Sequence, residues 1–113
     1  MAVEEYAHGS SIWADVVAEN LPEITERLSL SWSTWSGRWA VLPKAGGSAV
    51  LSGGLIRTDT VGTFQMKIGA SLVTPEAVPE GSYIIVCQAD NAIADFSKEF
   101  AKVEIDVIAA KIP

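Results

Sequence analysis

Apolar and polar residues alternate at 63–68 and 103–107, and a largely apolar segment at 83–89 places Tyr83, Ile85, Cys87 and Ala89 at a spacing of two. This period of two is the pattern of half-buried β-strands, because successive side chains of a strand point to opposite faces. We therefore expect the apolar side chains of each segment to lie on one face and to form the core. They are Phe64, Met66, Ile68, Tyr83, Ile85, Cys87, Val103, Ile105 and Val107.

The segment 28–32 alternates in the same way, with Leu28, Leu30 and Trp32 separated by serines. It predicts a further strand with these three residues in the core. Shorter apolar runs predict a strand at 39–42 and one or two more at 49–51 and 55–58. Glycine pairs at 46–47 and 53–54 interrupt these runs, which indicates a turn at the first pair and a bulge or tight turn at the second.

The segment 12–20 has a different period. Its apolar residues, beginning with Ile12 and Trp13, recur at three-to-four spacing after two serines that could cap a helix. This pattern predicts a short helix that ends at Asn20, because Pro22 disfavours helical dihedral angles at the residue before it.

These elements together predict a mainly β fold. About six to eight short strands separated by turn residues are typical of an antiparallel β-sandwich. We expect an N-terminal arm with one short helix over residues 1–22 and a sandwich domain over 23–113, since 113 residues is the size of one ordinary domain.

Charge and hydropathy limit the kinds of molecule that the chain is expected to bind. The 14 Asp and Glu against 8 Lys and Arg give a formal charge of −6, which disfavours nucleic acids and anionic membrane surfaces. No apolar run approaches the roughly 20 residues of a membrane-spanning helix, and no signal peptide is visible. We expect a protein that is assembled inside the cell.

The residues that could carry catalysis are few. The single histidine, His8, lies in the predicted arm, where we expect a solvated residue or an interface contact. Cys87 is expected to be a buried, inert thiol. Asp90, Asn91 and Asp95 could offer oxygen ligands to calcium, but turn capping is the favoured interpretation. We expect no enzyme activity, no metal and no cofactor.

Four tryptophans give the best indication of function. Trp35 lies in a Ser-Thr-Trp-Ser-Gly segment that reads as an exposed turn, where it could anchor an interface. The candidate interface residues are Tyr6, Ile12, Trp13, Trp35 and Trp39. Two alternatives stay open: Trp35 and Trp39 could stack on the sugar rings of a cell-surface glycan, or all four tryptophans could be packed inside the domain.

Two stretches of the sequence resemble fibronectin type III and related immunoglobulin-like domains. Leu-Ser-Leu-Ser-Trp at 28–32 is similar to their Trp-bearing second strand. The later stretch is similar to their Pro-Gly turn and sixth strand, and reads Pro79-x-Gly81-x-Tyr83-x-Ile85-x-Cys87-x-Ala89-x-Asn91. The resemblance implies an immunoglobulin-like sandwich, with the tryptophan and the tyrosine as core residues.

Three further motifs, at 62–68, 81–91 and 99–105, resemble strands of small sandwich domains in tailed-bacteriophage virion proteins. They read Gly-Thr-Phe-x-Met-x-Ile, Gly-Ser-Tyr-x-x-Val-x-x-x-Asp-Asn and Glu-x-x-x-Val-x-Ile. This resemblance implies a structural subunit of a head decoration, tail or baseplate that is assembled in the host cytoplasm. Its partners would be copies of itself and other virion proteins.

Overall fold

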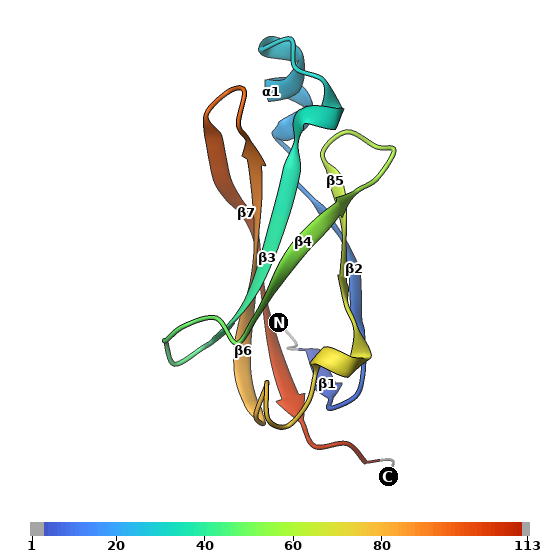
Figure 1. The fold of residues 1–113 in the computed structure, drawn as a ribbon, viewed down its shortest axis with the longest axis vertical. Coiled ribbons are helices and arrows are strands. Elements are labelled where there is room, and N and C mark those ends of the chain that lie inside the picture. Colours follow the sequence, from blue (N-terminus) through green and yellow to red (C-terminus); the bar gives the residue numbers. More distant parts are fainter. Residues whose placement is uncertain (1–3, 112–113) are drawn as a thin grey trace.

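Seven strands form one mixed β-sheet in the computed structural model, which describes residues 4–111 (Figure 1). The strands are β1 (Glu4–Ala7), β2 (Ile12–Val17), β3 (Ser36–Pro43), β4 (Leu51–Arg57), β5 (Thr63–Ile68), β6 (Gly81–Asn91) and β7 (Phe96–Ile108). Helix α1 (Leu21–Arg27) and two 3₁₀ turns, η1 (Trp32–Thr34) and η2 (Ala70–Leu72), complete the described elements. The prediction of a mainly β fold is confirmed.

The order of the strands is β1-β7-β6-β3-β4-β5-β2. All neighbouring strands are antiparallel except β1 and β7, which run parallel. The prediction of a purely antiparallel arrangement is therefore wrong for this pair. In Figure 1, β3, β6 and β7 lie on one side and β2 and β5 on the other, and β4 crosses between them. The sheet therefore curls until β2 and β7 approach each other.

Strand β4 causes this curl because it changes partner along its length. Leu51 to Leu55 pair with β3, whereas Ile56 and Arg57 pair with β5. Of the one or two strands predicted at 49–51 and 55–58, the structure thus has one, which continues through Gly53 and Gly54.

The core fills the inside of the curled sheet. Eight of the predicted core residues are buried there: Phe64, Met66, Ile68, Tyr83, Ile85, Cys87, Ile105 and Val107. Leu30 and Trp32 are half-buried and pack against this core. Strand β6 runs through the middle, paired with β3 on one edge and β7 on the other, so the Pro-Gly turn and the strand after it are central to the fold.

Leu28 and Val103 are not core residues, contrary to the prediction. Leu28 is the C-cap of α1 and is 51% exposed. Val103 lies opposite Ile85 on the inner face, but it is 40% exposed because β1 pairs only with the last four residues of β7. A side chain on the core-facing side of a strand stays accessible where nothing covers that edge.

The predicted strand at 28–32 is wrong. The alternating Leu-Ser-Leu-Ser-Trp stretch connects α1 to η1, and Ser29 adopts a positive φ of 53°. The Ser31 side chain accepts a hydrogen bond from the backbone N–H of Ser33 and so caps η1. Serines favour such local bonds over a ladder, which explains why alternation here does not give a strand.

The helix predicted at 12–20 is also wrong, since this stretch forms β2 and pairs with β5. The buried pair Ile12 and Val16 and the exposed pair Trp13 and Val17 are each four residues apart. A spacing of four keeps two residues on one face in a helix and in a strand alike. Together with β1, this places two strands of the sheet in the segment predicted as an arm and a helix.

The observed helix α1 begins at Leu21, directly after Asn20, where the predicted helix ended. Pro22 occupies the first turn of α1, where a missing N–H costs nothing because the first N–H groups of a helix have no intrahelical partner. Leu21 and Thr25 are buried and dock the helix on the end of the sheet. Within residues 4–111, no helix has the length and apolar character needed to cross a membrane.

Trp39 packs closely against the backbone of Gly53. The two residues are paired across the β3–β4 ladder, and the Trp39 indole is buried over the Gly53 backbone. A Cβ added to Gly53 would lie 2.6 Å from Trp39 Cζ2. Position 53 therefore has no room for a side chain while the indole stays in place.

We expect Gly53→Ala to lower the free energy of unfolding by about 1–3 kcal/mol, because the buried indole must shift. Gly54→Ala is the matched control, since a Cβ there would come no closer than 3.8 Å to another atom. It should change the free energy of unfolding by less than about 1 kcal/mol. Urea denaturation of both variants measures this, and equal stability of the two would contradict the account.

Candidate functional site

The five candidate interface residues differ strongly in exposure. Trp35, Trp39 and Ile12 are buried, Tyr6 is half-buried, and only Trp13 is exposed, with 63% of its surface accessible. This burial corrects the interface prediction for Ile12, Trp35 and Trp39. It also corrects the alternative in which Trp35 and Trp39 stack on a glycan.

Trp35 is a core residue with 0% exposure. Its ring meets the ring of Phe96 edge-on at a centroid distance of 5.3 Å, and its carbonyl oxygen accepts a hydrogen bond from Arg57 Nη1. The Ser-Thr-Trp-Ser-Gly segment is not a free turn, because it carries the chain from η1 directly into β3. The sequence pattern alone does not reveal that this turn faces inward.

Trp13 lies on the outer face of the β2–β5–β4 part of the sheet. It is paired with Lys67, whose Nζ lies 5.0 Å from the centroid of the indole ring. Val17 on the same strand and Ile56 on β4 are also large, exposed apolar side chains on this face. We call this surface the Trp13 face; it consists of Trp13, Asp15, Val17, Ile56, Gln65 and Lys67.

The N-terminal segment is held against the rest of the protein. His8 Nε2 donates a hydrogen bond to the carbonyl of Val78 at 2.7 Å, so the prediction of a solvated His8 is wrong. The Tyr6 hydroxyl donates to the carboxylate of Glu4, and this bond with partial burial raises the pKa of Tyr6 to about 12. Residues 1–3 of the predicted arm lie outside the described residues.

Asp90 and Asn91 organise the hairpin between β6 and β7. Partial burial raises the pKa of Asp90, but hydrogen bonds from Arg38, Ser97 and Gln88 outweigh it and hold the pKa below its ordinary value. Asn91 Oδ1 accepts from the backbone N–H groups of residues 93 and 94, as the capping interpretation predicts. Among residues 4–111, no three His, Cys, Asp or Glu side chains cluster closely enough to hold a metal.

Cys87 is buried on the inner face of β6. Burial raises the pKa of the thiol to about 11, so the reactive thiolate is rare at neutral pH. Its position opposite Trp39 on the neighbouring strand gives it a packing role in the core.

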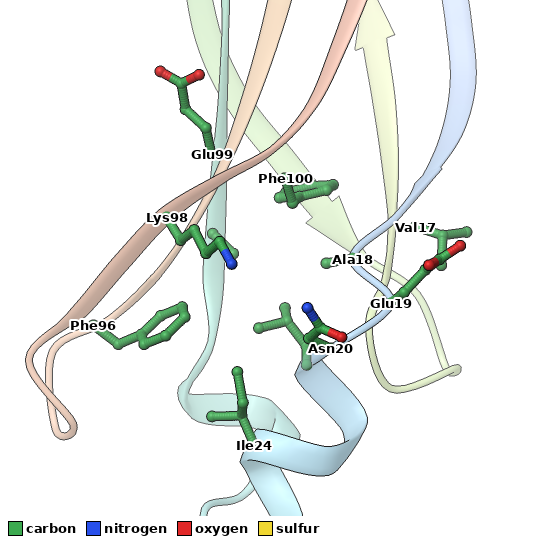
Figure 2. A pocket seen from close by; sticks show the side chains of 11 residues that line it. Val17, Ala18, Glu19, Asn20, Ile24, Phe96, Lys98, Glu99 and Phe100 are labelled. Carbon is green, nitrogen blue, oxygen red and sulfur yellow. The ribbon is translucent and has the colours of Figure 1, made fainter.

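A cavity of about 410 Å³ opens at the α1 end of the sheet, which we call the α1 pocket (Figure 2). Ile24 of α1 and Phe96 and Phe100 of β7 supply apolar walls. Phe100 is the extra residue of a bulge, since its neighbours Glu99 and Ala101 pair with consecutive residues of β6. Bulges of this kind redirect a side chain, and here Phe100 lines the pocket.

The polar groups around the α1 pocket are arranged unevenly. Figure 2 shows the Lys98 amine and the Asn20 amide directed toward the pocket, whereas the carboxylates of Glu19 and Glu99 point away. The Oε1 atom of Glu99 lies 3.7 Å from Nζ of Lys102, so this carboxylate pairs with Lys102. No carboxylate of residues 4–111 lies within ion-pair distance of Lys98.

Sequence reasoning missed this pocket. The available signal was Phe-Ser-Lys-Glu-Phe at 96–100, in which alternation places Lys98 on the same face as Phe96. A lysine on a core-facing position marks an edge that is open to solvent. The contribution of α1 could not be foreseen, because the helix was predicted in the wrong segment.

A scan of the chain against protein-family models gives no match, and a search of the curated proteins finds no similar sequence. The interpretation of the two surfaces therefore rests on the residues themselves.

Asp90 should make stability depend on pH. Because its pKa in the folded protein is below the value of about 3.9 in an unfolded chain, its contribution is present above that value and is lost as the pH falls through the folded-state pKa. We expect Asp90→Asn to be less stable than the wild type at pH 7 and the difference to shrink below about pH 4.

Thermal melts between pH 2.5 and 7 measure this effect. Asp59→Asn removes one carboxylate at an exposed turn position and is the control, for which we expect no such pH-dependent difference. A constant difference between Asp90→Asn and the wild type across this range would show that the charge of Asp90 is not what stabilises the hairpin.

Proposed function

We propose that this chain is a non-enzymatic assembly module that acts through protein–protein contacts, with Trp13 as the anchor residue. The observation that carries the proposal is the 63% exposure of Trp13 on a paired strand, whereas Trp35 and Trp39 are buried in the core. A large exposed aromatic on a rigid element is typical of the centre of an interface.

The Trp13 face suits this role physically. Pairing of β2 with β5 fixes the backbone beneath the indole, so little conformational entropy is lost when a partner covers it. Val17 and Ile56 extend the apolar area, while Lys67, whose Nζ lies over the indole, and Asp15 offer charges beside it. A stable contact centred here needs about 1,200–2,000 Å² of total buried area.

The proposal includes an immunoglobulin-like fold. The resemblance at 28–32 does not support it, because this stretch is not a strand. Two structural features support it beside the resemblance at 79–91. Strands β7, β6 and β3 are neighbours, as strands G, F and C are in such folds, and β5 pairs with β2, as E pairs with B. The Tyr83 hydroxyl donates to the carbonyl of Pro79, which matches the tyrosine corner at the start of strand F.

The most specific form of the proposal is a structural subunit of a tailed-phage virion. It rests on the motifs at 62–68, 81–91 and 99–105, two of which form the strands β5 and β6. Its partners would be further copies of the chain and other virion proteins, met during assembly in the host cytoplasm.

Trp13→Ala tests the proposal. We expect the wild-type chain to self-associate with rising concentration in sedimentation velocity experiments and the variant to remain monomeric, because the anchor of the contact is lost. The stability of the variant should change by no more than about 1 kcal/mol, since the side chain is exposed.

Ile93→Ala is the matched control, because it removes a strongly exposed apolar side chain from the β6–β7 hairpin, away from the Trp13 face. It should associate like the wild type. Equal association of the wild type and Trp13→Ala, or a wild-type chain that remains monomeric at all concentrations, would contradict self-assembly through this face.

A further inference from the structure

We propose that the α1 pocket is a second docking site, which binds a short extended segment of a protein partner by one large apolar side chain and an adjacent carboxylate. The site adjoins the Trp13 face, with which it shares Val17 at the end of β2, but Trp13 itself lies near the start of that strand and does not line the pocket.

The apolar part of the segment follows from the walls and the size of the pocket. About 410 Å³ is at the lower end of the range of roughly 300–1,000 Å³ for ligand sites, so it has room for one aromatic or long aliphatic side chain. Phe96 and Phe100 are both only partly buried and present ring surface to such a group. Ile24 faces them from the helix side of the pocket (Figure 2).

The charges that line the pocket indicate that the bound segment carries a carboxylate. Lys98 directs its amine toward the pocket without a carboxylate of the described chain in ion-pair range, whereas Lys44 and Lys102 each have one. Asn20 adds an amide that can donate to the same group. An acidic group beside the apolar anchor would pair with Lys98, and a basic group there would be repelled.

We expect the bound segment to be extended, because the edge of β7 beside the pocket is not paired with another strand of the described chain. From Phe96 to Ala101, β7 pairs with β6 on one edge only, because β1 covers only Ile105 to Ile108. The free backbone groups can bond to an added segment. The bulge at Phe100 and the inward-facing Lys98 oppose the addition of a long regular strand, so a short segment fits better than the edge strand of a second copy.

The test uses the ¹⁵N-labelled full chain and a blocked peptide, acetyl-Gly-Phe-Asp-Val-Gly-amide, followed by NMR. We expect chemical-shift changes confined to residues 17–24 and 96–100. Replacing the Asp of the peptide by Asn should weaken binding about two- to fivefold, the range of an exposed ion pair. Trp13→Ala should bind the peptide like the wild type, which separates this site from the Trp13 face.

Two matched variants identify the cation. Lys98→Gln should bind the Asp and Asn peptides equally, whereas Lys102→Gln, which removes the same charge from the outer face of β7, should keep the preference for Asp. An absence of shift changes at millimolar peptide, or an equal affinity of the wild type for both peptides, would overturn the proposal.

Two further outcomes would assign the pocket to another occupant and so overturn it as well. If 3-phenylpropionate binds as tightly as the peptide, the pocket is a site for small organic acids. If the same residues shift when the chain is concentrated without peptide, the occupant is a second copy.

Discussion

The packing of the Trp39 indole over the backbone of Gly53 is the contact on which the rest of the structure depends. It fixes β4 against β3 three residues before β4 changes partner to β5. That change carries β5 and β2 to the other side of the core, so the sheet can curl around Trp35, Phe64 and their neighbours. A side chain at position 53 would displace the indole at the point where the sheet turns.

The same curl divides the tryptophans between the core and the surface. Trp35 and Trp39 fill the inside, and Trp32 covers it in part while donating a hydrogen bond from Nε1 to the carbonyl of Thr58. On β2, Ile12 and Val16 point into the core, and Trp13 points to the opposite, outer face. The curl also stops short of joining β2 to β7, which leaves a free edge beside the α1 pocket.

The sequence predicted well those strands whose two faces differ. Phe64, Met66 and Ile68 alternate with polar residues, and the bounds of β5 were predicted without error because a register slip would expose all three. Prediction failed for Ile12 and Val16, whose spacing of four fits both a helix and a strand. It also failed for Trp35, which packs against Phe96, 61 residues further along the chain. The α1 pocket needed both the correct helix and the bulge at Phe100, and neither has a clear local signal.

The four tryptophans are divided between core and surface, and both the fold and the assembly proposal rest on this division. ¹⁹F NMR of the chain labelled with 5-fluorotryptophan, with a soluble gadolinium chelate as broadening agent, tests it directly. We expect strong broadening of the Trp13 resonance, a smaller effect on Trp32 and almost none on Trp35 and Trp39. Strong broadening of Trp35 or Trp39, or protection of Trp13 in the monomer, would contradict the account.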